Sequence, residues 1–232
     1  MSISKAFSKL VLLVLRSLFL YGFTDARRGS TILHLVFAVL SLYIVVHSPL
    51  ASIPIFSMLI AFYMVFGIGS SLLYSALVSS IPATWMGLTN LLYTWINRGI
   101  ILLTPFLDVF IRAEIGSIIV FSLMQNINIA ELCYLSYRIS KTFSLAIGYF
   151  WRISSQILKE SSEMLYVHGL KGESSWKTLA MLFVRGDEIV DQFTEGVYLK
   201  QFSYMPKPIY SRKTVLVQLL MAISVLVIAF LF

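Results

Sequence analysis

The residues that could do chemistry are few in this sequence, and their spacing forms no catalytic or metal site. The three histidines, His34, His47 and His168, fall in separate segments without the spacing of metal ligands. No serine or cysteine has both a histidine and a carboxylate nearby, as nucleophilic catalysis requires. Neither G-x-x-x-x-G-K-[ST] nor H-E-x-x-H occurs. We therefore expect a protein that is not an enzyme and that binds no cofactor or metal.

The single cysteine and the net charge exclude further kinds of site and partner. Cys133 excludes an internal disulfide and a multi-cysteine metal site, and we expect it to be a small buried residue. The formal net charge is +7, but the basic residues are dispersed among apolar segments. This dispersal is typical of the positive-inside rule and not of a nucleic-acid-binding face. We expect no nucleic-acid partner.

A few ionisable residues interrupt the apolar segments. Asp108 and Arg112 are four residues apart, so they share a helix face and can pair. An ion pathway needs paired ionisable groups inside membrane spans, and most of these residues can reach an interface. We expect part of 96–115 to lie at the membrane interface. The residues in question are Asp108, Arg112, Glu114, Glu131 and Arg138.

The composition indicates a membrane protein. Hydrophobic residues make up 58% of the 232 residues, charged residues only 12%, and the mean hydropathy is +0.85. Soluble domains carry about 25% charged residues. The clearest span is Thr214–Phe232, which has no charged residue and follows Arg212 and Lys213. These two basic residues predict a cytoplasmic start for this span.

The remaining spans precede a polar segment. Thr31–Val46 and Leu50–Gly69 form a predicted hairpin with a His-Ser-Pro turn, and two arginines before it put its start in the cytoplasm. Further apolar runs cover 71–96, 100–124 and 129–151. Both ends of this region look cytoplasmic, so an even number of spans, four, should separate them.

The predicted fold is therefore an all-α integral membrane protein with about five transmembrane helices, in the cell membrane. Residues 2–23 read as an amphipathic interfacial helix, with a first spanning helix as the competing interpretation. The predicted segments are an N-terminal interfacial segment (1–30), a transmembrane bundle (31–151), a cytoplasmic segment (152–213) and a C-terminal transmembrane helix (214–232).

The segment 152–213 is the part that resembles a soluble protein. It contains nine of the 18 basic and seven of the 11 acidic residues. We predict three amphipathic helices: one capped by Gly169, one starting at Ser174 or Ser175, and one at Asp187, where the second helix could also continue. Pro206 and Pro208 should end the helical segment. The apolar faces could pack internally or fit a partner groove.

Five short stretches, in this order, carry a family resemblance. They are Phe23-Thr24-Asp25-Ala26-Arg27; Tyr149-Phe150-Trp151-Arg152 followed by Glu160 and Glu163; Val167-His168-Gly169; Arg185-Gly186-Asp187-Glu188-Ile189; and Thr194-Glu195-Gly196. From about Thr24 to Phe232 the chain resembles the transmembrane T component of energy-coupling factor (ECF) transporters, the family that includes the membrane subunit of cobalt importers. Both signature arginines of that family are absent, and His168 and Glu195 occupy their approximate places.

The resemblance implies a coupling subunit of an importer of vitamins or transition-metal ions. Two ABC-type ATPase subunits would dock on the helices of 152–213, and a separate substrate-binding membrane protein (the S component) would pack beside them. The docking residues implied are His168, Gly169, Arg185, Glu195 and Gly196, with Arg185 as a substitute for the missing charge. Arg152, Glu160 and Glu163 would support the helices. A membrane scaffold without an ATPase partner is the main alternative, and a self-sufficient channel or carrier is a third.

Overall fold

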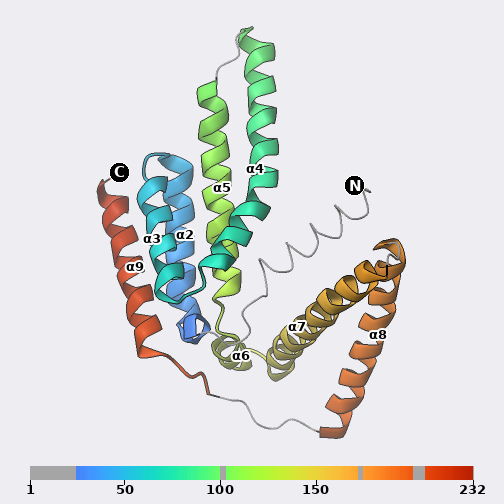
Figure 1. The fold of residues 1–232 in the computed structure, drawn as a ribbon. Coiled ribbons are helices and arrows are strands. Elements are labelled where there is room, and N and C mark those ends of the chain that lie inside the picture. The colour runs from blue at the N-terminus through green and yellow to red at the C-terminus, as the bar shows by residue number, and fades with distance from the viewer. Residues whose placement is uncertain (1–24, 100–102, 172–174, 201–206, 232) are drawn as a thin grey trace. The chain divides into compact units, whose positions relative to one another are not determined.

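The computed structural model describes residues 25–99, 103–171, 175–200 and 207–231, and the predicted interfacial segment 2–23 lies outside them. The described residues form eight α-helices and one 3-10 helix and contain no strand (Figure 1), so the all-helical prediction is confirmed. In chain order these are η1 (Asp25–Arg28), α2 (Thr31–His47), α3 (Ser52–Val65), α4 (Gly69–Arg98), α5 (Leu103–Gln125), α6 (Ile129–Tyr137), α7 (Lys141–Leu170), α8 (Ser175–Lys200) and α9 (Arg212–Leu231).

The described helices belong to two compact units, which are treated separately here. Helices η1, α2 to α5 and α9 form one unit, and α6 to α8 form the other. Among the described helices, α9 is the one whose length and composition suit a membrane crossing, with 19 residues from Arg212 to Phe230 at a mean hydropathy of 2.2. Helices α2 and α3 are apolar but shorter, and α5 carries three ionisable residues.

The unit of α2 to α5 and α9 buries several polar side chains beside an apolar core and exposes further apolar side chains on its outside. In α2 the buried residues include Thr31, His34 and Ser41, and His34 Nε2 lies 3.1 Å from Ser122 Oγ of α5. Helix α9 likewise buries Thr214 and Gln218. The exposed residues of these two helices include Ile32, Leu35, Val36, Val39, Val46, Leu216, Leu220, Ile223, Val227 and Phe230.

Small residues let α4 lie close to α5. Ser71, Ser75, Ser79 and Ala83 are spaced by four and are all buried, so they form one stripe along α4. Small side chains at such spacing allow close helix approach, and their hydroxyls bond across the interface. Ser79 Oγ donates to Glu114 Oε1 of α5 at 2.8 Å.

Gln125 ties three elements together at the end of α5. Its Nε2 donates to Ser75 Oγ of α4 at 2.8 Å, and its Oε1 accepts from Tyr63 of α3 at 2.5 Å. Its backbone carbonyl accepts from Arg27 Nε at 2.8 Å. Burial lowers the pKa of Arg27, whose guanidinium nevertheless remains charged at any physiological pH. The hydrogen bond from Arg27 thereby holds η1 against the end of α5.

A second set of contacts fixes the start of α9 at the same end. Ser30 N donates to Gln218 Oε1 at 2.8 Å, and Thr214 Oγ1 donates to the Asp25 carbonyl at 2.8 Å. A Cβ at Gly29 would clash with the Gln218 amide, so a larger residue there would displace the side chain that accepts from Ser30 N. Lys213 Nζ reaches the Val65 carbonyl at 3.4 Å. The first turn of α9 therefore meets η1 and the end of α3.

The structure corrects part of the sequence-based outline. The predicted turn after Val46 is confirmed, and Gly67, with φ +66°, forms the turn between α3 and α4. The run 129–151 is not one helix: α6 ends at Tyr137, and α7 begins at Lys141. Ser140 precedes α7 and its hydroxyl accepts from Phe143 N at 3.4 Å, an N-cap arrangement that starts a new helix.

The segment 152–213 also differs from its prediction. Its described residues up to 200 contain two helices and not three, because α8 runs without interruption from Ser175 to Lys200 and Asp187 lies in its middle. The predicted boundary at residue 152 falls inside α7, which begins eleven residues earlier at Lys141. Aspartate favours helix N-termini but is tolerated inside a helix. Because the residues on both sides of Asp187 are helical, no new helix begins there.

Candidate functional site

The candidate site is the antiparallel hairpin of α7 and α8. Its helices have 30 and 26 residues, or about 45 and 39 Å at 1.5 Å per residue. They pack on each other, and Figure 1 shows α8 returning beside α7 after the turn at Lys171. Both helices separate apolar from polar residues more clearly than the bundle helices do. This is the pattern of helices with one packed and one water-facing side.

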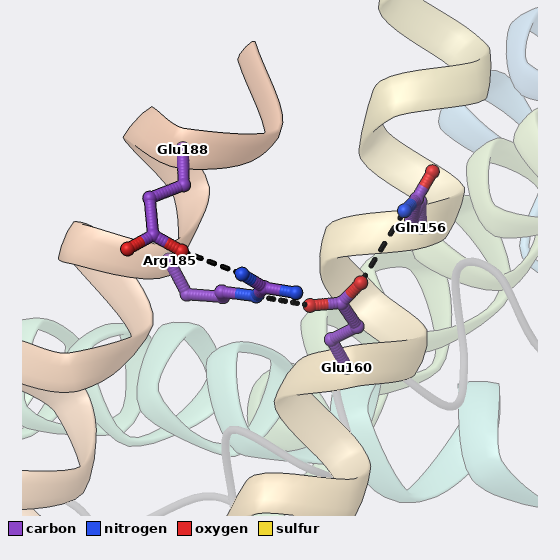
Figure 2. A network of polar contacts seen from close by, with 4 residues as sticks. All are labelled: Gln156, Glu160, Arg185 and Glu188. Carbon is purple, nitrogen blue, oxygen red and sulfur yellow. Dashed lines mark hydrogen bonds and ion pairs between the residues drawn. The ribbon is translucent and has the colours of Figure 1, made fainter. Parts of the chain in front are cut away.

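A polar network joins the two helices near the middle of the hairpin. Arg185 Nε of α8 lies 3.0 Å from Glu160 Oε2 of α7, and Arg185 Nη1 lies 2.5 Å from Glu188 Oε2 one turn further along α8. Gln156 Nε2 donates to Glu160 Oε1 at 3.3 Å. Figure 2 shows the guanidinium between the two carboxylates, with Gln156 above Glu160 on α7. We call these four residues the hairpin brace.

The two carboxylates of the brace hold the Arg185 guanidinium in a fixed position. The Arg185 side chain is 41% exposed and that of Glu160 is 25% exposed, so water screens the pair only in part. Hydrogen bonds to Glu188 and then to Glu160 raise the pKa of Arg185 further above its usual value. The guanidinium therefore stays protonated, and two carboxylates compensate its charge.

Close packing accompanies the brace. Gly186, next to Arg185, faces Ile157 of α7, since a Cβ at Gly186 would be 4.0 Å from Ile157 Cδ1. This is an ordinary contact distance, so alanine also fits there. Ile189, one turn further on, is buried. The hairpin is thus held by an apolar contact beside an ion pair.

The opposite side of α8 is apolar and exposed. Phe183 is 78% exposed, and Val184 beside it is also exposed, immediately before the brace residue Arg185. Val190 lies on the same side as Phe183, two turns further along α8, and is exposed as well. Exposed large apolar side chains in a row are typical of a contact surface for another molecule.

The implied docking residues lie at the two ends of α8. His168 and Gly169 fall in the last turn of α7, next to the turn that leads into α8, and Glu195 and Gly196 fall near the end of α8. From Ser175 to Glu195 the helix rises about 30 Å. The two motif positions are therefore separated by most of the length of the hairpin, and the fold does not bring them together.

Helix α7 ends about two residues later than predicted. Helix α7 continues through Gly169 to Leu170, where Lys171 N donates to the Val167 carbonyl at 3.1 Å, so Gly169 is inside the last turn and not the cap. Helix α8 continues four residues past Gly196. Helix ends are the least certain feature of a sequence pattern, because fraying and capping compete over a turn.

The structure brings some predicted residues together and leaves others apart. Glu160 and Arg185, predicted as a support and a docking residue, form one ion pair. Arg152 and Glu163 lie exposed on α7 at other levels. Gln156 and Glu188 were not singled out in the sequence, although their spacing of four and three residues from Glu160 and Arg185 is the signal that could have found them.

The residues considered for metal or nucleophilic chemistry lie apart. His34 is buried against Ser122, and His47 Nδ1 contacts the Tyr43 carbonyl at 2.8 Å in the last turn of α2. Cys133 is buried in α6, as predicted, and its carbonyl accepts from Ser144 Oγ at 2.6 Å. Among the described residues no three His, Cys, Asp or Glu side chains gather as metal ligands would.

Comparison with models of protein families, with curated proteins and with solved structures finds no match to this chain. The packing of the bundle and the geometry of the hairpin are therefore the observations on which a function must rest.

Proposed function

We propose that this chain is the transmembrane coupling subunit of an ATP-driven importer of the ECF type. It would link two ABC-type ATPase subunits to a separate substrate-binding membrane protein that carries vitamins or transition-metal ions. The observation that supports this most directly is the braced α7–α8 hairpin, with one motif position in the last turn of α7 and the other about 30 Å from the first residue of α8. Two separated contact points suit two ATPase subunits, one at each end.

The proposal includes a multi-pass position in the cell membrane, with α2, α3, α4, α5 and α9 as the five spans. The support is the distribution of side chains in this unit. Polar residues such as His34, Ser75 and Gln218 are buried, whereas the exposed positions of α2 and α9 are apolar. Such a distribution stabilises a bundle in lipid, where polar groups must find partners inside and apolar ones face the chains.

The positions of basic residues favour one orientation. Arg28 and Arg212 come from distant parts of the sequence, yet Ser211 N donates to the Arg28 carbonyl at 2.8 Å, so both lie at the same end of the unit. Lys213 and the turn between α3 and α4 lie there too. By the positive-inside rule this end faces the cytoplasm, where the ATPases would be.

Coupling requires the hairpin to move as a stiff body. An ATPase that closes on ATP binding would displace the helix ends it holds, and the displacement reaches the substrate-binding partner only if α7 and α8 keep their spacing. The brace and the contact of Gly186 with Ile157 supply that stiffness. The exposed surface around Phe183 suits an apolar contact whose register can shift as the partner moves.

A tagged pull-down in mild detergent, from a host that expresses the native operon, tests this function. Gly169→Trp and Gly196→Trp place a large side chain at each implied docking point. Gly186→Ala is the matched control, because its methyl group meets only ordinary contact with Ile157. We expect ATPase subunits with the wild type and with Gly186→Ala, and none or far fewer with each tryptophan variant.

If no ATPase accompanies the wild-type protein, the coupling function is wrong and a membrane scaffold becomes the better proposal. Transport by the purified chain alone in liposomes would instead establish a self-sufficient carrier.

A further inference from the structure

The helices of the α2-to-α5 unit differ greatly in length. Helices α2 and α3 have 17 and 14 residues, about 26 and 21 Å, whereas α4 and α5 have 30 and 23 residues, about 45 and 35 Å. Figure 1 shows the α4–α5 hairpin extending well beyond the turn that joins α2 to α3. A hydrocarbon core is about 30 Å thick, so the two hairpins cannot both match it.

An ion pair on α5 lies at the level where the shorter α2–α3 hairpin ends. Arg112 of α5 pairs with Asp108 at 3.0 Å, as the spacing predicted, and its Nη1 donates to the Val46 carbonyl in the last turn of α2 at 2.6 Å. From Arg112 to Leu103, helix α5 continues for about 14 Å beyond this level. The Asn90 side chain of α4 donates to the Pro105 carbonyl at 2.9 Å, so both helices continue together.

This extension, residues 84–98 of α4 and 103–107 of α5, is here called the hairpin tip, and its exposed residues are mostly apolar, with Thr84, Thr89, Asn97 and Thr104 also exposed. Trp85, Tyr93 and Ile96 are 73%, 66% and 76% exposed, and Leu103 of α5 is exposed as well. On α4 the exposed apolar residues occur on every side that does not face α5, because they include the neighbouring positions 85 and 86, 92 and 93, and 95 and 96. Between Gly69 and Leu107 the sequence has a single charged residue, Arg98.

We propose that the hairpin tip is embedded in the acyl chains of the bilayer, an inference that rests on the membrane position in the proposed function. A docked protein would cover one face of the hairpin, whereas lipid surrounds it, and the apolar residues are distributed around it. In water the same surface would be a large exposed apolar patch. From the sequence alone, part of 96–115 was expected to lie at the membrane interface, because this stretch contains Asp108 and Arg112. It overlaps the hairpin tip.

The ion pair then lies below the membrane surface and not at it. Asp108 and Arg112 are about one-third exposed and are paired with each other, and Arg112 also bonds to the Val46 carbonyl. Pairing and backbone contacts are how ionisable residues are accommodated at depth. The turn between α2 and α3 lies at this level too, so the bilayer must thin beside it or admit water.

Fluorescence of Trp95, which lies in the tip, tests the proposal. Trp85→Phe, Trp151→Phe and Trp176→Phe leave Trp95 as the single tryptophan in the full chain, reconstituted in phosphatidylcholine vesicles. Leu220→Trp, with Trp95 also replaced by Phe, is the reference because Leu220 is exposed on α9. We expect brominated acyl chains to quench Trp95 several-fold more than aqueous iodide does, as for the reference.

The Leu220→Trp reference distinguishes a failure of the membrane position from a failure of the embedded hairpin tip. If brominated lipid quenches the Leu220→Trp reference and iodide quenches Trp95, the hairpin tip is in water and this inference is overturned while the membrane position stands. Quenching of Trp95 by neither agent would assign the tip to a protein contact, such as a second copy, and would overturn it equally. If brominated lipid quenches neither tryptophan, the membrane position itself is wrong.

A second measurement keeps all four tryptophans. In a Cys133→Ser background, Ile96→Cys and Leu220→Cys should both fail to react with a water-soluble maleimide in open membrane fragments, because a thiol in lipid does not ionise. Lys207→Cys, at an exposed polar position, is the reactive control. Reaction of Ile96→Cys as fast as that control would overturn the inference.

Discussion

Arg185 illustrates how packing decides the role of a single residue. Its place in the sequence pattern suggested a docking charge, yet its guanidinium lies between Glu160 and Glu188. A charge that is compensated by two carboxylates offers little to a partner's acidic groove. We therefore propose that Arg185 has a positioning role: it would keep α7 and α8 at a fixed spacing, and docking would fall to the helix ends.

A double-mutant cycle tests this assignment. Arg185→Gln and Glu160→Gln should each lower ATP-driven uptake severalfold, and the double variant should be no worse than either single one, because both remove the same interaction. Asp191→Asn, at an exposed position of α8, is the control and should leave uptake unchanged. ATPase capture should persist in all of them.

If Arg185 were a docking charge, Arg185→Gln alone would lose the ATPase in the pull-down and Glu160→Gln would keep it.

At the scale of elements, helix α8 is the main correction to the sequence pattern. Asp187 follows Gly186, and this pair reads as a helix boundary in the sequence. In the fold Gly186 faces Ile157 at a position where alanine would also fit, and the backbone continues as helix. Local signals for a break were outweighed by packing along the whole hairpin, as tertiary contacts often outweigh propensity.

A proline at position 187 distinguishes a continuous α8 from a separate helix that begins at Asp187. In a continuous α8, Asp187→Pro removes a backbone hydrogen bond and clashes with the preceding turn, at a cost of about 3 kcal/mol or more. We expect a lower thermal unfolding midpoint in detergent and loss of ATP-driven uptake. Asp187→Ala, which keeps the helix, should have little effect.

If a third helix began at Asp187, proline would be accepted at its first turn and Asp187→Pro would behave like Asp187→Ala.

At the scale of the whole molecule, the unequal helix lengths would, in the proposed membrane position, require a bilayer of uneven thickness beside the protein. Leu50 in the α2–α3 turn and Ile96 in the hairpin tip are almost equally exposed on the protein surface. They differ in what should cover them. The turn has backbone groups without helix partners, which need water, whereas Ile96 lies within α4, whose backbone groups bond within the helix.

Cysteine labelling compares the two positions directly. In the Cys133→Ser background we expect Leu50→Cys to react with a water-soluble maleimide much faster than Ile96→Cys does, because water reaches the turn between α2 and α3. Equal protection of the two thiols would mean that lipid covers the turn as well and that the bilayer is not thinned there.

The sequence by itself determined the helical class, the turn after Val46, the final apolar helix and the pairing of Asp108 with Arg112. These depend on composition, on a local turn signal and on a spacing of four residues, all of which are local. It also limited the chemistry, because the residue types for catalysis are scarce and scattered.

Only the tertiary structure decided which distant residues meet. Gln125 with Tyr63 and Ser75, Gln218 with Ser30, and Arg185 with Glu160 are pairs whose partners are 25 to 188 residues apart. No periodicity encodes such pairs, because they form only when helix packing brings the side chains together. The same packing made α8 one helix and left the α4–α5 tip exposed above its shorter neighbours.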